Sequence, residues 1–159
     1  MKYIRYILII IPVFIIAYLA FLSISSRFNE PPQMVKGKLA DCPDFPNCIC
    51  TESYSNKNFE PIAIDLENTN TEWDLLKSAI VEAGGEIQRE ENVYLWATFV
   101  TPLFRFVDDF EARLDTSNSC IHLRSASRVG KYDFGTNLRR INRVLEIFRE
   151  QRKRIKNKK

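Results

Sequence analysis

The stretch Phe106–Ser127, FVDDFEARLDTSNSCIHLRSAS, decides the fold. Polar and apolar residues alternate along 106–115 and again along 120–127, a pattern typical of strands that bury one face. The residues between them, 116–119, are Thr-Ser-Asn-Ser, which favour a turn. The sequence therefore predicts a β-hairpin over this stretch.

The register of the hairpin follows from its hydrophobic pattern. With Asp115 opposite Cys120, Glu111 lies opposite Arg124 on the same face, and Arg113 lies opposite His122. The apolar side chains then gather on the other face, as a buried face requires. They are Phe110, Ala112, Leu114, Ile121 and Leu123, together with Ser125. We therefore expect a ladder of acidic and basic side chains on one face of an antiparallel sheet.

The remaining elements place this hairpin in a fold class. Strands are predicted over 61–66, 86–90 and 93–100 from their alternation. A helix is predicted over 71–83, with Trp73, Leu76 and Ile80 on one face. A second helix begins near Asn137, and its apolar side consists of Leu138, Ile141, Val144, Leu145 and Phe148. The expected class is α+β, with an antiparallel sheet of about five strands and two helices on one face.

The N-terminal segment predicts a membrane helix. Residues 6–26 carry no charged side chain, and about 20 apolar residues match the thickness of a bilayer. We expect residues 1–26 to be a transmembrane anchor. A long signal peptide is the alternative, because Ser23-Ile24-Ser25 has the spacing of a cleavage site. Residues 27–41 are predicted to be a Pro-containing linker that holds the domain off the bilayer.

The expected domain covers residues 42–150 and is followed by a basic tail over 151–159. Residues 28–138 hold 10 Lys or Arg against 18 Asp or Glu, so the net charge of +3 does not describe the folded body. DNA binding would fit the charge of the basic tail, but the predicted compartment argues against it. The tail is either a solvated helix end or a contact with anionic lipid heads. Basic residues flank both ends of the apolar segment and leave its orientation open.

Three motifs carry a family resemblance. They are CPDFPNC at Cys42–Cys48, FVDDFE at Phe106–Glu111 and RSASRVGKYDFGTN at Arg124–Asn137. In this order they resemble the domain-of-unknown-function 1499 family of bacteria and plastids. The resemblance implies a domain without an established activity that commonly follows a membrane or export signal. Cys50 and Cys120 depart from the family pattern.

The four cysteines suit an oxidising compartment. Cys42 and Cys48 bracket a short loop and are candidates for a disulfide, and Cys50 with Cys120 is a candidate for a second one. The sequence leaves the pairing open, and metal binding or buried thiols are alternatives. The spacing Cys-x5-Cys-x-Cys is not that of a zinc site, so we expect no metal and no cofactor.

The second motif supplies an acidic cluster, Asp108, Asp109 and Glu111. Asp109 and Glu111 share a strand face while Asp108 points away, which limits a three-carboxylate metal site. Ion pairs with the neighbouring arginines are the favoured use. His122 is the one histidine of the chain, and Ser125 should point away from it.

The third motif offers a ligand site. Glycines permit tight turns, and a helix begins near Asn137 with its free N–H groups, so that arginines beside it suit an anion or a lipid head group. The candidate ligand-binding residues are Arg124, Ser127, Arg128, Gly130, Asp133, Gly135, Asn137 and Arg139. The alternative is a capped connection in which Asp133 bonds backbone amides. The apolar segment 101–106 either plugs the sheet or lines a pocket for an apolar ligand.

These observations favour a non-catalytic envelope binding or assembly module for an anionic or lipid ligand. It would be a single-pass protein of the inner membrane, with its domain facing the periplasm or the outside. The expected partners are the membrane and either an anionic lipid or an envelope protein, without nucleic acid. The alternative is a hydrolase or metal-dependent enzyme that uses Asp108, Asp109, Glu111 and His122.

Overall fold

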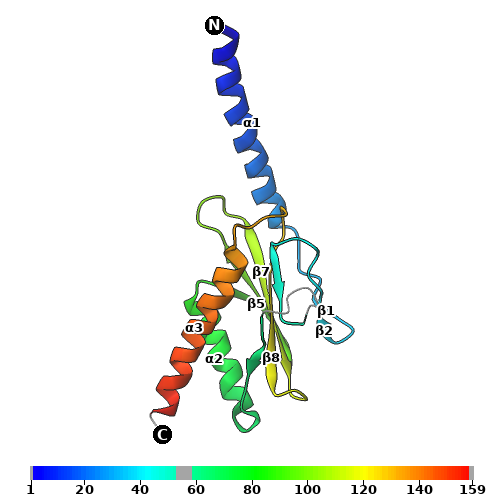
Figure 1. The fold of residues 1–159 in the computed structure, drawn as a ribbon, viewed down its shortest axis with the longest axis vertical. Helices are drawn as coiled ribbons and strands as arrows, with labels where there is room; N and C mark the ends of the chain where they lie inside the picture. The colour runs from blue at the N-terminus through cyan, green and yellow to red at the C-terminus, as the bar shows by residue number, and fades with distance from the viewer. Residues whose placement is uncertain (1, 53–58, 158–159) are drawn as a thin grey trace.

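A computed structural model describes residues 2–52 and 59–157 of the chain. Helix α1, Lys2–Ser26, projects from one end of an α+β domain (Figure 1). Its segment Tyr6–Ser26 is long and apolar enough to cross a membrane, a property that a signal sequence shares. The predicted membrane helix is therefore present as a helix of the right length and composition.

The main sheet is antiparallel, and its central strands follow the predicted register. Within the described residues it has six strands in the order β3-β8-β7-β6-β5, with β4 also paired to β8. The strands are β3 Cys48–Cys50, β4 Ile62–Ala63, β5 Glu86–Glu90, β6 Tyr94–Val100, β7 Val107–Asp115 and β8 Cys120–Ser127. In the β7–β8 hairpin, Asp115 pairs with Cys120 and Glu111 with Arg124, as predicted.

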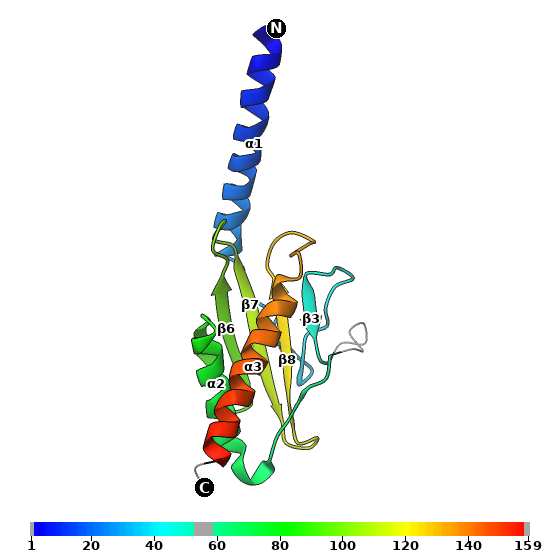
Figure 2. The ribbon, with the colours of Figure 1, turned by 60° about the vertical axis from the view of Figure 1, so that its left-hand side comes forward.

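Helices α2, Thr69–Glu82, and α3, Thr136–Lys156, cover one face of this sheet (Figure 2). The buried core between them contains the predicted faces of both helices. Its largest members include Trp73, Leu76, Ile80, Phe99, Phe110, Ile141 and Phe148. Leu138 was predicted to belong to this buried set, but it is 43% exposed. It lies in the first turn of α3, where it lines a surface hollow with Ile49 of β3.

The opposite face of the sheet is covered by a segment expected to be a linker. Two short strands, β1 Met34–Val35 and β2 Lys38–Leu39, form a hairpin there. Leu39 is buried against Tyr94 and Trp96 of β6. Residues 34–39 thus pack onto the sheet as part of the folded body. Strands of two residues have no hydrophobic period, so the sequence pattern did not show them.

The other differences concern short elements. β4 spans two residues of the predicted strand 61–66, and a 3-10 helix, η1 Leu66–Asn68, follows it. β3 begins at Cys48, the last residue of the first cysteine motif, and was not predicted. Helix α3 continues through Lys156, so most of the predicted basic tail is helical. It ends at the other end of the domain from α1 (Figures 1 and 2).

Candidate functional site

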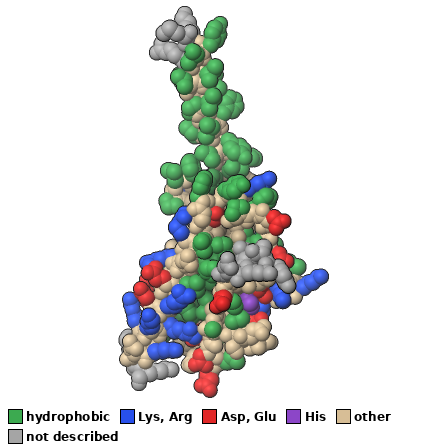
Figure 3. All heavy atoms as spheres, viewed as in Figure 1, with side chains coloured by type: hydrophobic (Ala, Val, Ile, Leu, Met, Phe, Trp, Pro, Cys, Tyr) green, Lys and Arg blue, Asp and Glu red, His purple; other side chains and the backbone are tan. Residues whose placement is uncertain are grey.

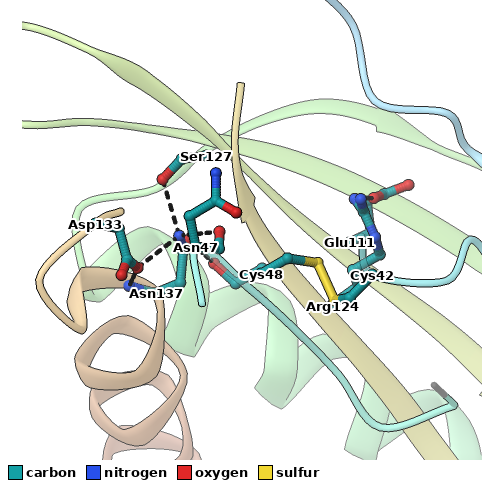
Figure 4. Close-up of a disulfide and its surroundings, with 9 residues drawn as sticks. Cys42, Asn47, Cys48, Glu111, Arg124, Ser127, Asp133 and Asn137 are labelled. Atoms are coloured by element: carbon teal, nitrogen blue, oxygen red, sulfur yellow. Dashed lines mark hydrogen bonds and ion pairs between the residues drawn. A yellow bond between two sulfur atoms is a disulfide. The ribbon is translucent and has the colours of Figure 1, made fainter. Parts of the chain in front are cut away.

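The polar face of the hairpin carries two buried ion pairs. Glu111 is fully buried and bonds Arg124, and the Tyr94 hydroxyl donates to Glu111 Oε1 at 2.7 Å. Figure 4 shows Glu111 and Arg124 facing each other. Burial raises the pKa of Glu111, and the charge of Arg124 opposes that shift. The ionised state of Glu111 therefore depends on its arginine partner.

Asp109 forms the second pair and connects it to α1. Arg128 donates to both oxygens of Asp109 at 2.7 and 3.0 Å, and Trp96 Nε1 donates at 2.8 Å. Another nitrogen of Arg128 donates to the backbone oxygen of Ser26 at 2.9 Å. Ser26 Oγ accepts from the Val107 amide at 3.0 Å. The end of α1 is thus bonded into the same network.

Asp108 lies on the helix-covered face, as predicted. Its carboxylate accepts from Arg140 of α3 at 2.7 Å. Burial raises the pKa of Asp108 while the charge of Arg140 lowers it. Each of the three carboxylates of the second motif is therefore paired with a different arginine. The three carboxylates do not point toward a common position where they could bind one metal ion.

Backbone amides at the start of α3 are hydrogen-bonded by a side chain of the third motif. Asp133 accepts from the amides of Gly135 at 2.9 Å and Asn137 at 2.7 Å. Asn137 Nδ2 donates to Ser127 Oγ and to the backbone oxygen of Asn47 (Figure 4). The Asp133 carboxylate therefore occupies the position at the helix N-terminus where an anion would bind. This is the capped connection described as the alternative in the sequence analysis. Arg139 is exposed and bonds the backbone oxygen of Phe134 at 2.8 Å.

The first motif joins this network through Asn47. Its Nδ2 donates to the Gly130 oxygen at 2.8 Å, and its backbone oxygen accepts from the Ser127 amide at 3.0 Å. Cys42 and Cys48 form a disulfide beside it (Figure 4). The three motifs, widely separated in sequence, thus meet at one end of the sheet.

The candidate bridge between Cys50 and Cys120 is not formed. Cys50 pairs with Arg124 on β8, four residues along the strand from Cys120. At about 3.3 Å per residue this is about 13 Å, beyond the reach of a disulfide.

His122 lies in a separate polar cluster at the far end of the hairpin. Its Nε2 is 3.4 Å from Cys120 Sγ and 3.6 Å from Asp115 Oδ2, and its Nδ1 is 3.1 Å from Thr51 Oγ1. Thr51 Oγ1 also accepts from the Leu123 amide at 3.0 Å, which ties the ring to the backbone of its own strand.

The same cluster has the ligand types of a metal site, because ligand atoms of Asp115, Cys120 and His122 lie within 4.8 Å of one another. Arg113 already occupies the carboxylates: its Nη2 donates to Asp115 at 2.9 Å and to Glu52 at 2.7 Å. Burial raises the pKa of the Cys120 thiol and lowers that of His122. The guanidinium charge disfavours a cation, so the cluster is best described as an ion-pair network.

In contrast to the polar cluster around His122, the end of the domain next to α1 exposes apolar side chains. Two loops, 101–106 and 128–135, expose Leu103, Tyr132 and Phe134 by 79, 75 and 92%. Apolar side chains continue from α1 onto this end of the domain (Figure 3). A groove of about 380 Å³ lies between the loops and α1. Its apolar walls are Leu19, Leu22, Leu103, Phe104, Phe106 and Phe134.

A second apolar hollow, of about 700 Å³, lies on the other side of the same loop. It is lined by Phe45, Ile49 and Leu138 among others, and shares Tyr132 and Phe134 with the groove. The predicted pocket-lining role of 101–106 is therefore found, as one wall of the groove beside α1.

One side of α1 contacts the domain, and the sequence analysis did not predict this contact. Leu19, Leu22, Ser23 and Ser26 recur at the spacing of one helix face. The two leucines are half-buried and the two serines are buried, whereas most of the described α1 residues before them are exposed. Ser23 Oγ donates to the Arg105 oxygen at 3.3 Å. Ser23 and Ser26, at i and i+3 in a mostly apolar segment, were the available signal.

Fold and network together define an α+β domain whose motif residues hold one another, attached to a single apolar helix. A family model described as "Protein of unknown function (DUF1499)" matches residues 38–148. The chain belongs to this family, as the three motifs indicated. No curated protein and no solved structure matches the chain.

Proposed function

We propose that this protein is a single-pass membrane protein whose domain rests its α1 end in the bilayer surface and binds an amphiphilic component of the envelope there. The observation that carries the proposal is the position of loop 101–106 beside the last turns of α1. Leu103 and Phe104 of this loop share a groove with Leu19 and Leu22 of the helix.

The length of α1 allows the depth of this contact in the membrane to be calculated. The 21 residues of Tyr6–Ser26 rise about 31 Å, which is the thickness of the hydrocarbon core, about 30 Å. Leu19 lies seven residues before Ser26, hence about 10 Å deeper along the axis. If α1 spans the bilayer, a loop at the level of Leu19 lies among lipids, where exposed Leu and Phe side chains are favourable.

Charge at the same end supports this placement. Arg27 directly follows α1, and Arg105 and Lys131 belong to the two loops; all three side chains are exposed. Basic side chains at the edge of an apolar patch suit the head groups of anionic lipids, at about 1 kcal/mol each near the surface. The membrane and its anionic lipids are therefore the proposed partners.

The proposed location is the inner membrane, with the domain in the periplasm or outside the cell. The Cys42–Cys48 disulfide supports an oxidising compartment. The buried, hydrogen-bonded Ser26 supports retention of α1 as an anchor, because removal of the helix would leave the backbone contact of Arg128 unmade.

A depth measurement on the full chain tests the proposal. F134W places a fluorescent reporter on the exposed loop, while Trp73 and Trp96 are buried. In nanodiscs that contain brominated lipids, we expect strong quenching of F134W fluorescence. S117W, at the tip of the β7–β8 hairpin, is the matched control and should not be quenched. Equal quenching of the two reporters, or none of F134W, contradicts the proposal.

A further inference from the structure

The groove beside α1 differs from an ordinary lipid-facing helix surface because it has a polar floor. Its deep side is formed by Asp108 and Ser127, and its apolar walls come from both the domain and the membrane helix. Asp108 is buried and held by Arg140, so its position is fixed. An occupant would meet hydrocarbon at the mouth and hydrogen-bonding groups at the floor.

The polar groups on the floor of the groove determine which lipid head group could bind there. They are hydroxyls and carboxylates, from Thr101, Ser127, Thr136, Asp108 and Asp133. Among the described residues that line the groove, none is Lys or Arg. A phosphate on the floor would face two carboxylates and no Lys or Arg of the lining, whereas a hydroxyl can donate to the carboxylates.

We propose that the groove binds one hydrocarbon chain and the hydroxyl-bearing head of an uncharged membrane lipid of the diacylglycerol class. This inference rests on the proposed seating of the domain, because the groove opens toward lipid only if its walls Leu19 and Leu22 lie in the membrane. A helix-only contact with bulk lipid would not extend to Val129, which lines the groove from the domain side.

Photolabelling of the full chain in nanodiscs tests the inference. The probe is a diacylglycerol with a diazirine on its acyl chain, compared with a phosphatidylglycerol that carries the same chain. We expect diacylglycerol to label the 128–136 loop, including Val129, more than phosphatidylglycerol does. Equal or stronger labelling by phosphatidylglycerol overturns the head-group assignment, and labelling confined to the outward side of α1 overturns the groove.

Two matched substitutions on α1 separate the groove from the surrounding lipid. L22W fills the groove, and we expect labelling at Val129 to fall about tenfold, equivalent to about 1.4 kcal/mol of binding free energy. I24W adds the same bulk on the lipid-facing side, where Ile24 is exposed, and should leave this labelling unchanged. Equal effects of the two substitutions contradict the inference.

The depth measurement distinguishes the two proposals. Quenched F134W fluorescence without labelling at Val129 leaves the seating intact and refutes the groove. Unquenched F134W fluorescence without labelling refutes both.

Discussion

The buried motif network and the exposed loops at the α1 end lie side by side and differ in almost every property. In the network, Asp108, Asp109 and Glu111 are each paired with an arginine and buried. In the loops, Leu103 and Phe134 are exposed and apolar. The network pairs its carboxylates and arginines with one another, whereas the loops present apolar surface that the domain itself does not cover. The comparison separates the residues that hold the fold from those proposed to act on the membrane.

The largest expected effect comes from breaking one pair of the network. R124M leaves Glu111 as an uncompensated buried charge, which typically costs about 3–5 kcal/mol. Chemical denaturation of the full chain in detergent measures this loss. E111Q/R124M removes the stranded charge and should recover much of the stability. A loss under about 1 kcal/mol for R124M would show that the pair does not hold the fold.

The Cys42–Cys48 disulfide stabilises the same end of the network by a smaller amount. It closes a short loop, with a sequence separation of 6, so C42S/C48S should cost about 2 kcal/mol in the unfolding free energy. The matched variant C50S/C120S removes two thiols without a disulfide. Alkylation with and without reductant checks the pairing, and modification of four cysteines without reductant contradicts it.

On the other side of the comparison, Phe134 should act on the membrane and not on stability. It is 92% exposed and has a left-handed backbone, φ 52°, which is unfavourable for a bulky side chain. F134G relieves that conformation and should change the unfolding free energy by less than about 1 kcal/mol. The variant should also weaken the membrane contact of the loop.

Ser119 provides the matched control for this change. It has the same φ of 52° in the turn at the far end of the hairpin. S119G should shift stability similarly and leave lipid labelling of the 128–136 loop unaltered. Destabilisation by several kcal/mol in F134G alone would place Phe134 in the fold instead.

The smallest effect is the pH dependence contributed by His122. Burial lowers its pKa below the usual 6.5, so the unfolded chain binds more protons than the folded one just below that pH. Stability should therefore fall as the pH drops below 6.5, toward the folded pKa. Unfolding curves between pH 7 and 5 measure this slope, and H122Q should flatten it. An unchanged slope in H122Q would assign the dependence to other groups.

The strands and the ion-pair ladder could be predicted because their signals are periodic and local. The register of β7 and β8 follows from alternation alone, and it already places Glu111 opposite Arg124. β1 and β2 are too short for a period. The partners of the motif carboxylates depend on how α3 crosses the sheet, so Arg140 could not be assigned to Asp108 from spacing.

Only one of the two parts of the site beside α1 could be predicted from the sequence. The apolar segment 101–106 stood out, since loops are usually polar. Its partner, the stripe of α1 that includes Leu22 and Ser26, was hidden because an apolar helix predicts lipid on all sides. That stripe becomes visible only when the hydrogen bonds of Ser26 place it against the domain.

The most direct test of this division of roles is the double variant L103N/F134N in the full chain. Because both side chains are exposed, we predict an unfolding free energy within about 0.5 kcal/mol of the wild type. Labelling of Val129 by the diacylglycerol probe should fall about tenfold. Unchanged labelling, or loss of the fold, would contradict the account that the network holds the domain and the loops act on the membrane.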